Sequence, residues 1–120
     1  MKEHKKDFGS LSTRALLARR RAAAGRLGAV EQTLAGSLVH QTRRCGKAGC
    51  RCAQGDPHGP YAYFAARVQT QARGGGRLRY VPAALAQVVG SYLRRGEHVE
   101  AVLAEISAIN AELLARRELR

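Results

Sequence analysis

Three cysteines and one histidine stand within fourteen residues of this 120-residue chain: Cys45, Cys50, Cys52 and His58. Tetrahedral zinc takes four such ligands, and three cysteines with one histidine are a common structural set. The binding energy of a structural metal becomes folding energy, which a chain this short needs because its core is small. The segment therefore predicts a zinc-stabilised turn at residues 45–58.

Two other interpretations of the cysteine segment stay open. The gaps of four, one and five residues differ from the paired two-residue gaps of the common zinc motifs, so the thiols could instead be small buried side chains. A thiol-based metal or redox sensor is the second alternative. His40 is the substitute ligand if His58 is not used. A closed disulfide framework is not expected, because the number of cysteines is odd.

Positive charge is concentrated in one part of the chain. The sequence carries 21 Lys and Arg against 9 Asp and Glu, a formal net charge of +12. Residues 1–80 hold 16 of the basic and 4 of the acidic side chains, whereas residues 81–120 hold five of each. This uneven distribution of charge predicts a nucleic-acid partner, with duplex DNA as the first choice. The alternative is a solvated basic surface without a partner. No membrane partner is expected, since no apolar run approaches the ~20 residues of a span.

Hydrophobic periodicity and glycine placement predict an α+β fold. The expected segments are a disordered basic tail at 1–9, a basic helix at 10–35, a zinc turn with a three-stranded antiparallel sheet at 36–82, and a helical hairpin at 83–120. Ser10 or Ser12 is expected to cap the first helix. The strands are expected at 37–44, 61–70 and 77–81, with an open glycine turn at 74–76.

The hairpin prediction depends on Gly96, which is expected to end a helix over 83–95 before a second helix begins. Apolar residues of the second helix then recur at steps of three and four, as in a heptad seam: Val99, Val102, Ile106, Ile109 and Leu113. The seam is expected to pack against another helix of the same chain, to form a dimer interface, or to do both.

The sequence also resembles an uncharacterised bacterial domain family with a CGKxxCxC core, a later HGPY, and a proline entry to paired helices. The matching residues are Cys45-Gly46-Lys47, Cys50, Cys52, His58-Gly59-Pro60-Tyr61 and Arg79-Tyr80-Val81-Pro82. The resemblance covers about residues 36–115, and the basic extension before it is less typical. The family has no established activity, but its members resemble small companions of mobile elements, which implies a role near nucleic acid.

Arginine suits phosphate contacts, and a two-stranded β-ribbon fits the major groove. The expected contacts come from the first helix, the zinc turn and the sheet: Arg14, Arg19, Arg20, Arg21, Arg26, Arg43, Arg44, Lys47, Arg51, Arg67, Arg73, Arg77 and Arg79. Tyr61, Tyr63 and Tyr80 are candidates for stacking on bases, although a core position is expected for at least two of them.

Enzymatic activity is not expected. No phosphate-binding loop, dinucleotide fingerprint or serine-hydrolase elbow is present, and Asp56 is the only acidic residue between Glu31 and Glu97. The sequence predicts a non-catalytic accessory of a mobile-element or recombination complex. A cytoplasmic, nucleoid-associated location is expected, since the N-terminus has no apolar signal region. The alternative is a protein-interaction subunit that docks through residues 83–120.

Overall fold

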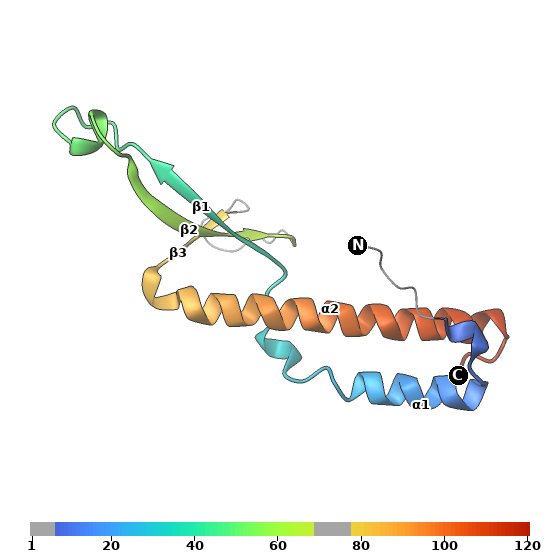
Figure 1. The fold of residues 1–120 in the computed structure, drawn as a ribbon. Helices are drawn as coiled ribbons and strands as arrows, with labels where there is room; N and C mark the ends of the chain where they lie inside the picture. The colour runs from blue at the N-terminus through green and yellow to red at the C-terminus, as the bar shows by residue number, and fades with distance from the viewer. Residues whose placement is uncertain (1–6, 69–77) are drawn as a thin grey trace. The chain divides into compact units, whose positions relative to one another are not determined.

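A computed structural model describes residues 7–68 and 78–120 (Figure 1). The described residues form two compact units, each of which is considered by itself. The helical unit takes the chain up to Glu31 together with Glu97–Arg120, and the sheet unit is Gln32–Gly96. Several sequence predictions lie outside the described residues: the first six residues of the tail, the glycine turn at 74–76, and the contacts of Arg73 and Arg77.

The helical unit pairs α1 (Thr13–Ala24) with the C-terminal part of α2 (Ala86–Ala115). Its core is formed by Phe8, Leu16, Ile109 and Leu113, all buried. The α2 members of this core belong to the predicted heptad seam. The seam therefore packs within the chain, as one of the two sequence interpretations expected.

The predicted tail at 1–9 is wrong at its end, because Phe8 is only 7% exposed and belongs to the core. Arg116 holds this segment in place. Its Nη2 donates to the carbonyl oxygens of Phe8 at 3.2 Å and Leu11 at 2.6 Å, while its Nε donates to Glu112 at 2.8 Å. These long-range contacts order a segment whose composition alone suggests disorder.

The predicted helix over 10–35 is too long. Ser12 caps α1, since its Oγ accepts a hydrogen bond from the amide of Ala15 at 3.1 Å. The helix ends at Gly25, and Gly28 then adopts a φ of +68°, a conformation that breaks a right-handed helix and that glycine tolerates. The chain reaches the sheet unit through a short 3-10 turn, Val30–Gln32, instead of a further helix.

The sheet unit contains the expected three-stranded antiparallel sheet. Its strands are β1 (Gly36–Arg43), β2 (His58–Ala66) and β3 (Leu78–Val81), in the order β1-β2-β3. β2 pairs with β1 along most of its length but with β3 only from Ala62 to Ala65. The first residues of β2 and the last of β1 thus form a two-stranded ribbon that leads to the cysteine segment (Figure 1).

The predicted hairpin at 83–120 is wrong, because α2 is one continuous helix of 30 residues that passes through Gly96. Gly96 serves close packing there. A Cβ atom at this position would lie 2.2 Å from the carbonyl oxygen of Leu34, and the amide of Leu34 donates to the carbonyl of Tyr92 at 3.1 Å. A glycine inside a helix lowers helix stability by about 1 kcal/mol relative to alanine. The 30-residue helix forms in spite of this loss. In the described part of the chain no helix is long and apolar enough to cross a membrane.

Candidate metal centre

Four side chains converge at the end of the β1–β2 ribbon. The ligand atoms of Cys45, Cys50, Cys52 and His58 all lie within 4.8 Å of one another. The sulfur atoms of Cys45 and Cys52 are 3.6 Å apart, and Cys50 Sγ lies 3.1 Å from His58 Nε2. In a tetrahedral site with Zn–S bonds of about 2.3 Å, two sulfur ligands are about 3.8 Å apart. The four residues are therefore close enough to hold a metal ion, and the set is compatible with zinc.

A register shift between β1 and β2 and the conformation of Gly59 position His58 at the end of the ribbon. The register of the β1–β2 pair shifts between Gln41 and Arg43, so that Arg43 comes to lie opposite His58. Gly59 follows with a φ of +106°, and a Cβ atom there would lie 2.9 Å from the carbonyl oxygen of Gln41. Glycine at this place in the HGPY motif thus lets the two strands close on each other beside His58.

Turns in the loop between β1 and β2 place the cysteines close to one another. Gly46 adopts a φ of +81° immediately after Cys45, which turns the chain back at the start of the loop. Cys52 lies in a 3-10 turn, Arg51–Ala53, and is only 2% exposed. Its sulfur accepts a hydrogen bond from the amide of Cys45 at 3.3 Å. The amide of Cys45 thus donates to the same sulfur atom that would be the metal ligand.

Arg44 has a structural role that the sequence did not suggest. Its Nη1 donates to the carbonyl oxygens of Cys52 and of Gly55, the latter at 2.9 Å. The guanidinium thus ties the start of the loop to its later residues, and it places a positive charge against the carbonyl oxygen of Cys52. The sequence offered Arg44 as a phosphate contact, and nothing in the local residue pattern distinguishes it from Arg43.

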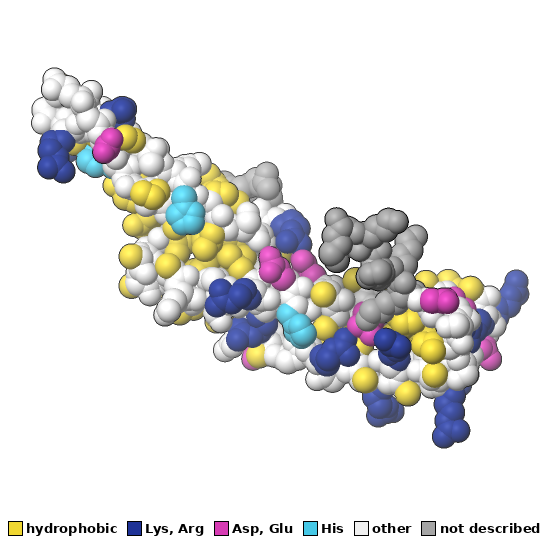
Figure 2. Space-filling view, viewed as in Figure 1, with side chains coloured by type: hydrophobic (Ala, Val, Ile, Leu, Met, Phe, Trp, Pro, Cys, Tyr) yellow, Lys and Arg dark blue, Asp and Glu magenta, His cyan; other side chains and the backbone are white. Residues whose placement is uncertain are grey.

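The other basic residues of the loop region point to solvent. Arg43, Lys47 and Arg51 are all exposed, and Figure 2 shows Lys and Arg side chains at the end of the ribbon. Asp56 is the only carboxylate between Gln32 and Gly96, whereas the same span holds ten Lys and Arg residues. The unit that contains the candidate metal centre is therefore strongly cationic.

In the helical unit the balance is different, with eleven basic residues against eight acidic ones. Three of the predicted nucleic-acid contacts are engaged inside this unit. Arg26 Nη2 lies 2.8 Å from the carboxylate of Glu105, and Arg19 Nε lies 3.8 Å from it. Sequence analysis missed this role of Glu105, because the two partners are distant from it along the chain.

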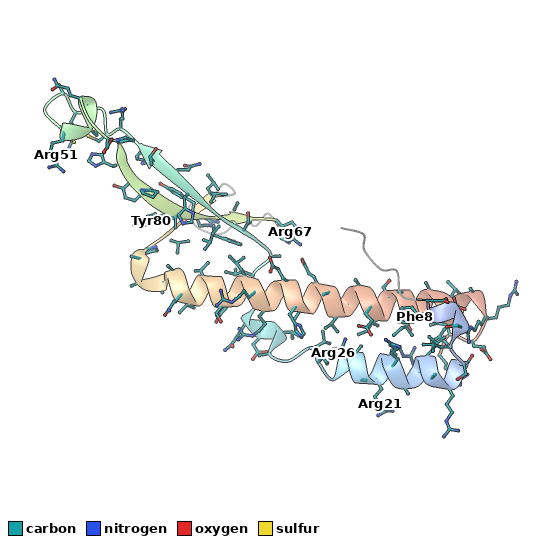
Figure 3. The ribbon with its side chains drawn as sticks, viewed as in Figure 1. Phe8, Arg21, Arg26, Arg51, Arg67 and Tyr80 are labelled. Carbon is teal, nitrogen blue, oxygen red and sulfur yellow. The ribbon has the colours of Figure 1, made fainter. Side chains whose placement is uncertain are left out.

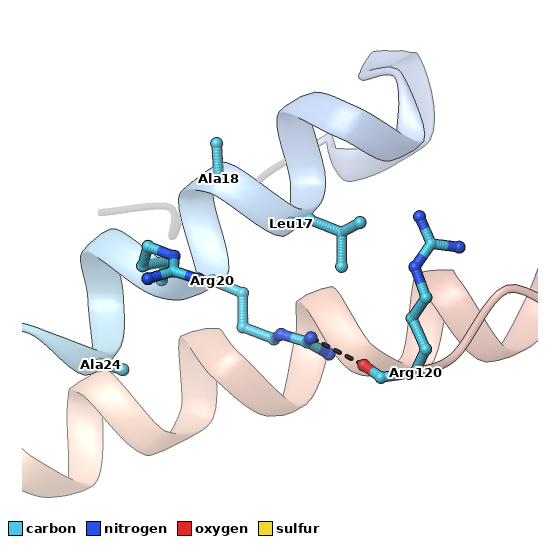
Figure 4. A pocket seen from close by; sticks show the side chains of 6 residues that line it. Leu17, Ala18, Arg20, Ala24 and Arg120 are labelled. Carbon is cyan, nitrogen blue, oxygen red and sulfur yellow. Dashed lines mark hydrogen bonds between the residues drawn. The ribbon is translucent and has the colours of Figure 1, made fainter.

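Arg20 is the third engaged residue. It donates to Asn110 Oδ1 at 2.9 Å. It also donates to the main-chain oxygen of Arg120 at 2.7 Å, the contact drawn as a dashed line in Figure 4. Arg14 and Arg21 are exposed on α1. Arg19 and Arg26 are also exposed, although both contact Glu105, so only Arg20 among these five arginines is half-buried.

The two predicted contacts in the described part of the sheet differ in exposure. Arg67 is exposed just beyond the end of β2, where Figure 3 labels it. Arg79 is half-buried and lines a hollow with Phe64 and Leu34, on the inner side of β3. Arg79 shares its face of β3 with the buried Val81, because alternate residues of a strand point to the same side.

A family model described as a domain of unknown function, DUF6788, matches residues 13–90 of the chain. No curated protein and no solved structure matches it. The matched range begins at α1 and includes the whole loop between β1 and β2, residues 44–57, which we call the metal loop. The sequence resemblance predicts a match over about residues 36–115 instead. The N-terminal helix is thus part of the family's domain. Because the match covers well over half of its residues, the chain belongs to the DUF6788 family.

Proposed function

We propose that this protein is a non-catalytic nucleic-acid-binding protein, in which a zinc ion held by Cys45, Cys50, Cys52 and His58 stabilises the basic end of a β-ribbon. The observation that carries the proposal is the charge of the sheet unit, with ten Lys and Arg residues against Asp56 alone. A folded surface so depleted of carboxylates suits a polyanion. Duplex DNA is the proposed partner of the ribbon.

The shape of the ribbon supports this partner. A two-stranded β-ribbon is narrow enough to enter the major groove of B-form DNA. Here the two-stranded part of the sheet ends in the metal loop, where Arg43, Lys47 and Arg51 are exposed. Zinc would hold the loop in one conformation, so that its basic side chains meet phosphates without a large loss of conformational entropy.

Four ligands of this kind favour a structural zinc over a catalytic one. A catalytic zinc keeps one coordination position for water or substrate and needs a general base nearby. The set of three thiols and one imidazole would fill four positions, and the unit offers only Asp56 as a carboxylate. We therefore assign the protein an accessory role in a DNA-processing complex, which fits the resemblance to companions of mobile elements.

Salt-dependent binding tests the proposal. The affinity of the zinc-loaded protein for a labelled duplex of random sequence is measured at increasing salt concentration. We expect the double variant Lys47→Ala/Arg51→Ala to lower the slope of log affinity against log salt by about 2, because each lost phosphate contact removes about 0.9. Arg44 is left intact, since it holds the loop together.

The matched control is Arg117→Ala/Arg120→Ala, which removes the same charge from exposed positions of the helical unit that are not among the predicted contacts. This variant is expected to leave the slope nearly unchanged. An equal loss in both variants would show that binding follows total charge and not the metal loop. An affinity that does not depend on salt would contradict nucleic-acid binding altogether.

A further inference from the structure

The sheet has an open face that carries three tyrosines. Exposure alternates along β3, where Leu78 and Tyr80 are 43% and 56% exposed while Val81 is only 5% exposed. Leu78 and Tyr80 therefore point away from the inner face. The strand register places Tyr80 opposite Tyr63, and Tyr61 lies two residues before Tyr63 on the same side of β2. None of the three tyrosines is in the buried core, contrary to the expectation from sequence.

The rings gather into one cluster without stacking on each other. The centroid of Tyr80 lies 6.2 Å from that of Tyr61 and 5.8 Å from that of Tyr63, with interplanar angles of 76° and 65°. Rings that meet edge to face do not cover one another as parallel rings do. More than half of the Tyr80 side chain remains accessible at the centre of the cluster, and Figure 3 shows its place on the sheet.

The surroundings of the tyrosine face, defined as Tyr61, Tyr63 and Tyr80, are neutral or basic. The β1 residues paired with Tyr61 and Tyr63 are Gln41 and Val39. No Asp or Glu lies on any of the three strands, whereas Asp56 belongs to the metal loop. Hydrophobic side chains also gather over the sheet in the view of Figure 2. The face thus combines aromatic rings with a cationic unit.

We propose that the tyrosine face binds unpaired bases of single-stranded nucleic acid by stacking, while the arginines of the sheet unit contact the phosphates. The inference rests on the proposed function and adds a second nucleic-acid surface to the ribbon. Aromatic rings on an open sheet are a recurrent way to bind bases, because every base has a flat π surface. Charge favours nucleic acid over a second copy of this chain as the partner of the tyrosine face. A second copy would bring ten further basic residues against the same cationic unit.

Tyrosine fluorescence gives a direct test. The chain has four tyrosines and no tryptophan, so its tyrosine emission is not masked. We expect oligothymidylate and oligouridylate to quench this emission in the zinc-loaded protein, and a blunt-ended DNA duplex, in which every base is paired, to quench it much less. The two single strands distinguish DNA from RNA as the source of the bases. The Tyr80→Ala variant is expected to bind the single strand about tenfold more weakly, as loss of one stacking ring typically does.

Two control variants separate the loss of the aromatic ring from other effects of substitution. Tyr80→Phe retains the ring and is expected to bind as the unaltered protein does, whereas Leu78→Ala removes a neighbouring apolar side chain and is expected to have little effect. An unchanged affinity in Tyr80→Ala, with no quenching by single strands but normal duplex binding, overturns this inference and leaves the proposed function standing. Absence of binding to every nucleic acid would overturn both.

Discussion

His58 and His40 show how a single position on a strand decides what a side chain does. His40 lies on β1 opposite Ala62 and is exposed, outside the group of potential metal ligands. His58 is the first residue of β2 and directs its ring to Cys50. The two histidines are chemically identical, so only their places in the ribbon separate a candidate ligand from a surface residue.

Substitution of single residues should show whether His58 or His40 binds zinc. We expect His58→Ala to weaken zinc binding by more than about 100-fold, because loss of a ligand should cost more than loss of the hydrogen-bonding partner of a ligand. Cys52→Ser should behave in the same way, whereas His40→Ala should bind one zinc per chain as tightly as the unaltered protein. The measurement is zinc competition with a chromophoric chelator. Retained affinity in His58→Ala together with loss in His40→Ala would reverse the assignment.

Among the secondary-structure elements, α2 differs most from expectation. Glycine after an apolar stripe usually signals a helix end, and Gly96 was interpreted in that way. The structure instead uses the missing side chain to admit the carbonyl of Leu34 against the helix. A close approach of this kind involves a residue about sixty positions away, which no local pattern can reveal.

A pair of glycine substitutions in α2 tests this explanation. Gly96→Ala should lower the free energy of unfolding by about 1–3 kcal/mol, as overpacking does, because its Cβ would overlap backbone atoms of Leu34. Gly90→Ala is the matched control. Its Cβ would meet only the flexible end of Arg94, at 3.4 Å, so it should stabilise the helix by up to about 1 kcal/mol. Equal effects in urea unfolding would show that the Leu34 contact is absent.

Considered as a whole, the molecule divides its stabilising interactions between the two units. The helical unit has an apolar core around Leu16 and Ile109, together with the Glu105 ion pairs. In the sheet unit, the buried hydrophobic side chains of the described residues are Cys52 and Val81, which do not form a large aliphatic cluster. A bound metal would therefore matter far more to the sheet unit than to the helices.

Metal removal should change the spectroscopic signal of the sheet unit far more than that of the helical unit. All four tyrosines lie in the sheet unit, so the near-ultraviolet circular dichroism of tyrosine reports on that unit alone. On addition of a strong chelator we expect this signal to fall to that of the unfolded chain, while most of the helical signal at far-ultraviolet wavelengths remains. A tyrosine signal that persists after the thiols become reactive would instead favour a metal or redox sensor.

Local chemistry was enough to predict a three-stranded antiparallel sheet, a cap at Ser10 or Ser12, and the grouping of Cys45, Cys50, Cys52 and His58 as a possible ligand set. Strand alternation, capping and ligand type each act over a few residues. Tertiary structure alone decided the continuity of α2, the clamp of Arg44 on the loop, and the burial of Phe8. The same holds for the arginines near Glu105 and for the open tyrosine face. Each of these depends on which distant segment packs against a residue, and burial and charge pairing are properties of that packing.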